Sequence, residues 1–114
     1  MADKPVSLNV LVTNNGPIKV TINPWARHVF PGDDVVFTPS GKITSYTVRW
    51  KTRASPLEGR KRTLRVAAKK RKKIAVRANA IAESVYHYSV TMYFNDPDTG
   101  NERFATVDPD MIID

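Results

Sequence analysis

The chain contains no cysteine, and this absence excludes several kinds of site at once. Without a thiol it cannot build a disulfide framework, a thiolate zinc site, an iron–sulfur cluster or a cysteine nucleophile. It also has no apolar run near the roughly 18–20 residues that a membrane-spanning helix needs. The opening residues MADKPVSLNV do not follow the basic-then-apolar order of a secretory signal. We therefore expect a cytoplasmic protein with no transmembrane segment.

Signs of catalysis are equally scarce. The five glycines stand singly along the chain, so they form no phosphate-binding loop, and no Gly-x-Ser-x-Gly elbow is present. The two histidines, His28 and His87, have no spacing that sets either beside a serine and a carboxylate. Residues 96–102 are rich in oxygen ligands but lack the twelve-residue calcium pattern, which favours a solvated hairpin loop. We expect no enzyme, no metal and no cofactor.

Acidic residues are almost missing from the middle of the chain. Between Arg49 and Arg77 there are 13 lysines and arginines and a single acid, Glu58. The rest of the chain carries 5 basic and 10 acidic residues, so the net charge of +7 arises in this middle segment. Such asymmetry bears on the partners of a protein rather than on its fold.

What the sequence has in abundance is apolar–polar alternation with a period of two, which is typical of strands. The 114 residues suffice for one domain. Turn-forming residues separate the alternating segments at short intervals. The segments lie at 6–12, 18–22, 27–30, 35–38, 45–51, 63–67, 74–76, 85–94, 103–107 and 111–113. The pattern predicts an all-β protein that is a single antiparallel β-sandwich spanning 1–114.

The basic segment at about 52–80 has two interpretations. Alternation at 63–67 and 74–76 predicts a hairpin whose tip is the run from Lys69 to Lys73. Apolar spacings of four, three and four residues from Ile74 to Val85 instead indicate one short helix within 66–84. In both cases the five consecutive cations must face water.

Alternation also predicts which side chains form the core. Tyr46, Val48 and Trp50 share one face of their segment, which we expect to be buried; if exposed, the two rings would offer stacking surfaces for bases. Trp50 should be more buried than Trp25, which has polar neighbours. The predicted core comprises Val35, Phe37, Val48, Trp50, Val90 and Met92.

Several segments resemble small bacterial cupredoxin-like or immunoglobulin-like sandwich proteins of unassigned role. The similarity rests on 23–25, on the Pro-Gly-Asp turn and apolar strand within 28–37, on the tyrosine-rich 85–90, and on 108–114. A cupredoxin-like fold implies a copper centre of two imidazoles and a thiolate. This chain has no histidine between Pro39 and Lys51 and has Val90 near the position of the cysteine, so the resemblance implies a metal-free member.

The basic block is the one signal that points to a ligand. From Gly59 to Ala82 there is no acid, so its cations have no local counterions. A polyphosphate backbone compensates such a block and releases counterions on binding. We expect a non-catalytic module that binds a polyanion, most plausibly DNA or RNA, with Arg49, Lys51 and Arg53 in support. The expected nucleic-acid-binding residues are Arg60, Lys61, Arg62, Arg65, Lys69, Lys70, Arg71, Lys72, Lys73 and Arg77.

Other roles for the block remain open. It can be a solvated loop that confers solubility, or it can contact an anionic membrane or an acidic protein. The main alternative function is structural self-assembly into a homo-oligomer. The basic loop of one copy would then contact the acidic C-terminal region of another, with Asp108, Asp110 and Asp114 as its counterpart.

Overall fold

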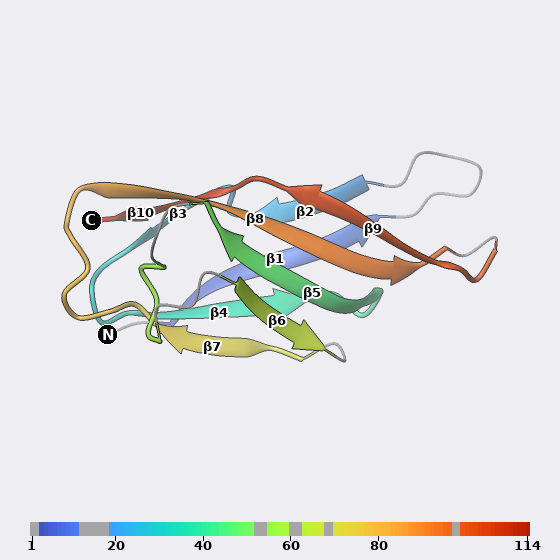
Figure 1. Cartoon of the computed structure of the whole chain (residues 1–114), viewed down its shortest axis with the longest axis horizontal. Helices are drawn as coiled ribbons and strands as arrows, with labels where there is room; N and C mark the ends of the chain where they lie inside the picture. Colours follow the sequence, from blue (N-terminus) through green and yellow to red (C-terminus); the bar gives the residue numbers. More distant parts are fainter. Residues whose placement is uncertain (1–2, 12–18, 52–54, 60–62, 68–69, 97–98) are drawn as a thin grey trace.

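Ten strands and no helix make up the part of the chain that the computed structural model describes, namely residues 3–11, 19–51, 55–59, 63–67, 70–96 and 99–114 (Figure 1). The strands are β1 (Asp3–Leu11), β2 (Lys19–Asn23), β3 (Ala26–Val29), β4 (Asp34–Pro39), β5 (Ile43–Trp50), β6 (Thr63–Ala67), β7 (Lys72–Ala75), β8 (Ser84–Asn95), β9 (Glu102–Val107) and β10 (Asp110–Ile113). Each overlaps one of the alternating segments of the sequence, although β1 begins three residues before the predicted 6–12 and β7 begins two residues before the predicted 74–76. The predicted all-β sandwich is therefore confirmed.

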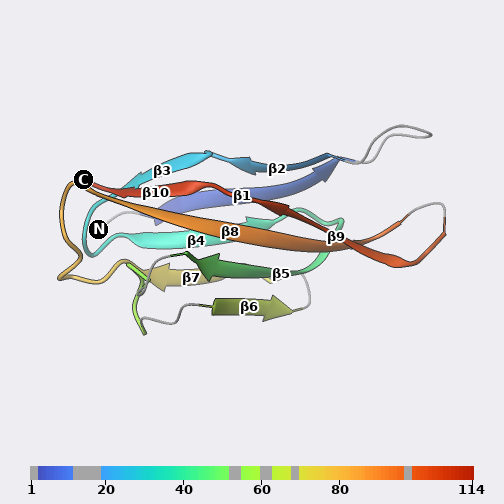
Figure 2. The same ribbon diagram turned by 45° about the horizontal axis from the view of Figure 1, so that its top comes forward.

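The strands form two packed sheets (Figures 1 and 2). A four-stranded sheet has the order β2-β1-β4-β7, and a six-stranded sheet has the order β3-β10-β8-β5-β6 with β9 also paired to β8. Six of the strand pairings are antiparallel, but β1–β4 and β3–β10 are parallel. The sheets are thus mixed rather than purely antiparallel, because the chain passes through β3 of the other sheet between β2 and β4.

The long strand β8 is the axis of the six-stranded sheet. One of its sides pairs with β5, while the other pairs first with β10 and then with β9. Asp108 and Pro109 separate β9 from β10, and the Pro109 carbonyl still accepts a hydrogen bond of 3.2 Å from the Tyr88 amide. β9, Pro109 and β10 together therefore line this side of β8 for most of its length.

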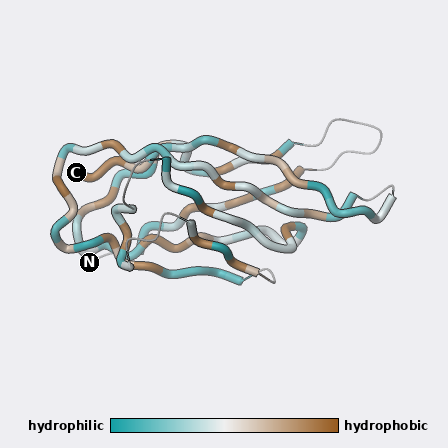
Figure 3. Tube along the Cα trace, in the orientation of Figure 1, coloured by the Kyte–Doolittle hydropathy of each residue, from teal (hydrophilic) through white to brown (hydrophobic). Residues whose placement is uncertain are grey.

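Alternation places the core between the sheets, as the banded hydropathy of the strands shows (Figure 3). The whole predicted core is confirmed, since none of its six side chains is more than 1% exposed. Trp50 is 1% exposed, whereas Trp25 is 53% exposed. Tyr46 is also fully buried, so neither Tyr46 nor Trp50 can stack against a base.

Within its described residues, the basic segment forms neither the predicted hairpin nor the alternative helix. β6 pairs with β5 in one sheet and β7 pairs with β4 in the other, so the two strands do not pair with each other. Each strand has apolar residues to bury against its own sheet: Val66 in β6, and Ile74 in β7. Between β6 and β7 the chain therefore passes from one sheet to the other, and the two strands end their sheets on the same side of the sandwich (Figures 1 and 2).

A buried phenol fixes this crossover. The hydroxyl of Tyr46, on β5, donates to the Lys70 carbonyl at 3.0 Å and lies 3.5 Å from the Phe37 carbonyl on β4. Tyr88, also buried, has no hydrogen-bond partner for its hydroxyl among the described residues. Both tyrosines are thus buried, but only the hydroxyl of Tyr46 has a hydrogen-bond partner among the described residues.

This difference predicts opposite effects for the same substitution. Tyr46→Phe should lower the free energy of unfolding by about 1 kcal/mol, because it removes the hydrogen bond from this hydroxyl to the Lys70 carbonyl. Tyr88→Phe should leave the free energy of unfolding unchanged or raise it, because it removes an unpaired buried hydroxyl. Urea unfolding of both variants against the parent measures the two effects. Equal losses from both would contradict the assigned hydrogen bonding.

The same tyrosines predict an alkaline loss of stability. Burial raises the pKa of Tyr46 to about 12, and burial, with a further contribution from Asp110, raises the pKa of Tyr88. A phenol whose pKa is higher in the folded state stabilises the fold fully below its ordinary pKa of about 10, and that contribution is lost as the pH rises. Between pH 10 and 12, each of the two tyrosines should therefore lower the free energy of unfolding by about 1.4 kcal/mol for every unit by which the pH rises. Tyr88→Phe should reduce the measured slope by about that amount, and an unchanged slope would show that Tyr88 ionises freely.

Candidate functional site

The predicted binding residues that the structure describes lie at separate places in the fold. Arg60, Lys61, Arg62 and Lys69 lie outside the described residues. The other six occupy three places: Arg65 is on the six-stranded sheet, Lys70 to Lys73 run from the crossover into β7, and Arg77 follows β7.

Arg65 has a second arginine beside it. Across β5 and β6, Arg49 pairs with Thr63 and Thr47 pairs with Arg65, so the two arginines are diagonal neighbours on the outer face of the sheet. Both side chains are exposed, and neither has an ion pair within the described part of the chain. Two like charges at this spacing repel each other until an anion lies between them.

A shallow groove runs across this outer face, and hydroxyl groups line it beside the arginines. We call it the hydroxyl face, and its lining residues are Thr47, Arg49, Thr63, Arg65, Ser89, Thr91, Tyr93 and Thr106. They are the outward positions of four adjacent strands, because β5 pairs with β6 and β8, and β8 pairs with β9. Thr91 and Thr106 lie opposite each other with their Oγ1 atoms 2.9 Å apart. Arginine forks and hydroxyls are the side chains that contact phosphate and sugar oxygens.

The crossover carries three further free cations. Lys70, Arg71 and Lys72 are exposed and make no ion pair with any described carboxylate. The hydrogen bond from Tyr46 on β5 holds the backbone of this segment at Lys70. These cations therefore lie on the same side of the sandwich as β6, the outermost strand of the hydroxyl face (Figures 1 and 2).

Lys73 differs from its neighbours because its charge is already compensated. Its Nζ lies 3.2 Å from Oδ1 of Asp3 and 3.7 Å from Oδ2 of Asp34. The hydrogen bond to Asp3, with the charges of both carboxylates, raises the pKa of Lys73. Charged side chains on an edge strand such as β7 also oppose pairing with other chains. Lys73 therefore has a structural role in the sheet.

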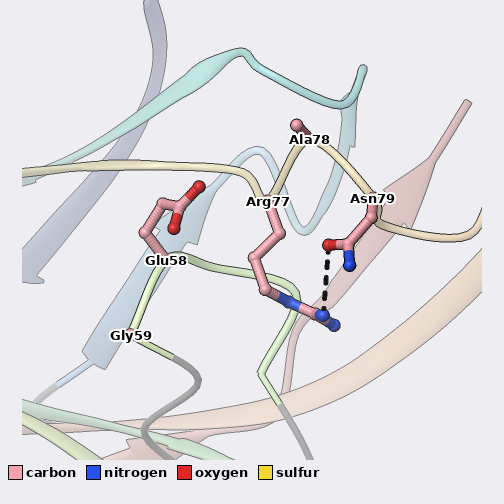
Figure 4. A pocket seen from close by; sticks show the side chains of 5 residues that line it. All are labelled: Glu58, Gly59, Arg77, Ala78 and Asn79. Atoms are coloured by element: carbon pink, nitrogen blue, oxygen red, sulfur yellow. Dashed lines mark hydrogen bonds between the residues drawn. The ribbon is translucent and has the colours of Figure 1, made fainter.

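Arg77 likewise serves the fold. Its Nε donates to the Ser55 carbonyl at 3.0 Å, its backbone amide donates to the Pro56 carbonyl at 2.8 Å, and Nη1 lies 3.5 Å from Oδ1 of Asn79. In the shallow depression that it lines, the Glu58 carboxylate is turned away from the guanidinium (Figure 4). Arg77 thus anchors the segment before β6 to the end of β7.

Three aspartates near the C-terminus are paired within the chain. Oδ1 of Asp108 lies 3.0 Å from Nζ of Lys51. The two histidines pair with the other acids: Nδ1 of His87 lies 2.5 Å from Oδ1 of Asp110, and Nδ1 of His28 lies 3.0 Å from Oδ1 of Asp114. Asp108, Asp110 and Asp114, the expected counterpart of the basic loop, therefore already have partners.

The described residues contain no group of three or more histidines and carboxylates that could hold a metal ion. The loop between β8 and β9 closes a hairpin, as predicted, and Asp96 at its start is 3.2 Å from Nη1 of Arg103. Within the described ranges no helix has the length and apolarity to cross a membrane.

Two parts of the site escaped the sequence analysis. The alternation of β5 and β8 already places Thr47, Ser89 and Thr91 on the outward face, but nothing in it indicates that Arg65 would lie beside them. The exposure of Phe104 on β9 was not predicted either.

No protein-family model matches the chain, and the comparisons with curated proteins and with solved structures found no significant similarity.

Proposed function

We propose that the protein is a non-catalytic module that binds nucleic acid through the hydroxyl face. The observation that carries the proposal is the pair Arg49 and Arg65, two adjacent exposed guanidinium groups without a described carboxylate partner. Phosphate oxygens accept hydrogen bonds from arginine in a bidentate geometry, and the surrounding hydroxyls suit sugar and phosphate contacts.

The cations of the crossover would contact further phosphates of the ligand beyond the hydroxyl face. Lys70 and Arg71 follow β6 along the chain and Lys72 begins β7 of the other sheet, so a chain of phosphates that leaves the hydroxyl face past β6 would reach them. Each phosphate that is neutralised releases counterions, which supplies sequence-independent affinity. Because these contacts are to the backbone, we expect little discrimination between base sequences.

Self-assembly, the alternative, has less support. Most described carboxylates of the C-terminal region are engaged by Lys51, the histidines and Arg103. In that region, Glu83 and Glu102 are the described acidic residues that make no ion pair with another described residue. A head-to-tail contact between copies would have to break several of the existing pairs.

Two measurements on the parent protein separate these functions. A fluorescently labelled mixed-sequence single strand should show saturable anisotropy at about 50 mM salt, where phosphate contacts are strong. Light scattering without nucleic acid should show a monomer at low salt. Concentration-dependent assembly together with no change in anisotropy would reject nucleic-acid binding in favour of self-assembly.

A further inference from the structure

One end of the hydroxyl face carries an exposed aromatic pair. Phe104 on β9 is 68% exposed and lies directly opposite Tyr93 on β8, with ring centroids 5.9 Å apart and an interplanar angle of 43°. Ala105 and Val107 of the same strand pack against the core, so Phe104 belongs to the outward set with Thr106. Its ring therefore contributes little to the core.

The pair is continuous with the arginines. Tyr93 lines the groove together with Arg65, and the residues opposite Tyr93 are Ser45 on one side and Phe104 on the other. The backbones of β6 and β9 are three strand spacings apart, which is about 14 Å. A strand of a few nucleotides spans this distance, with phosphates at the arginines and a base at the aromatic end.

We infer that the ligand of this face is single-stranded nucleic acid, with an unpaired base stacked on Phe104 beside Tyr93. The inference rests on the proposed function. An aromatic ring on an open sheet face can stack against any base, but only when the base is free of its own helix. In a duplex the base faces are covered by their neighbours, so only the phosphates could contact this surface.

The test compares three labelled probes of about 15 nucleotides, a length within the usual range of single-strand sites. The probes are oligo(dT), an abasic strand of the same length, and a duplex. The parent should bind oligo(dT) about 5- to 150-fold more tightly than the abasic strand, the range expected for one stacked base. Phe104→Ser should make the affinities for oligo(dT) and the abasic strand equal, whereas Phe104→Tyr, which keeps the ring, should retain the preference for oligo(dT).

The outcomes distinguish the two proposals. Equal affinity for oligo(dT) and the abasic strand, a preference for the duplex, or a ratio that survives Phe104→Ser would overturn base stacking while leaving phosphate binding in place. If no probe binds the parent at all, the proposed function fails and this inference fails with it. Because Phe104 is exposed, Phe104→Ser should melt close to the parent, which checks that any lost affinity is not lost folding.

Discussion

Trp50→Ala is expected to lower the free energy of unfolding by about 3–5 kcal/mol, a large part of the 5–15 kcal/mol typical of a domain. The side chain is 1% exposed and packs against Tyr88, with centroids 4.7 Å apart, and edge-on against Tyr86. Its removal leaves a cavity in the core between the two sheets, which relaxation of the surrounding structure closes only partly. Urea unfolding monitored by circular dichroism measures the loss.

Trp25→Ala is the matched control. It removes the same side chain from a position that is 53% exposed, so the free energy of unfolding should change by no more than about 0.5 kcal/mol. If Trp50→Ala proved as stable as the parent, the placement of β5 between β8 and β6 with this side chain in the core would be wrong.

The second large effect concerns binding. The double variant Arg49→Ser and Arg65→Ser should weaken binding to single-stranded DNA about 100-fold. This follows from two hydrogen-bonded contacts to charged phosphates at roughly 1.5 kcal/mol each. Folding should be little affected, because both side chains are exposed and neither makes an ion pair with a residue that the structure describes. Anisotropy titration and thermal unfolding of the same samples separate the two properties.

A double variant with Lys4→Ser and Lys19→Ser is the control for net charge. It also removes two positive charges, but from β1 and β2 in the other sheet. Its affinity should fall only slightly, since the charges lie away from the hydroxyl face. A similar loss in both double variants would mean that the overall charge, and not the hydroxyl face, governs binding.

Strand positions and core could be predicted from the sequence because both depend on local alternation. Val48 and Trp50 had to share a face whatever β5 paired with, and the Pro31-Gly32 turn is confirmed by a positive φ of 90° at Gly32. The burial of Phe37 could be predicted from the same alternation.

The composition of the site depends on which strands pair, and alternation does not determine this. The sequence joins Arg65 to Lys73 in one block, whereas the structure pairs β6 and β7 with different sheets and brings Arg49 beside Arg65. Likewise, the contacts of Lys73 with Asp3 and Asp34 exist because β7 lies against β4, next to β1. Net charge along the chain therefore overstated the number of free cations.

The similarity to cupredoxin-like and immunoglobulin-like proteins stays a prediction. Nothing in the two-sheet arrangement depends on it, and the proposed binding surface is built from residues outside the segments that carry the resemblance, apart from Ser89.

The salt dependence of binding tests the hydroxyl face most directly. For a single strand, the slope of log affinity against log salt changes by about 0.7 for each phosphate contact. The Arg49→Ser and Arg65→Ser variant should therefore have a slope shallower than the parent's by about 1.4, while the Lys4→Ser and Lys19→Ser variant keeps the slope of the parent. Equal slopes for the arginine variant and the parent would show that phosphates do not bind at Arg49 and Arg65.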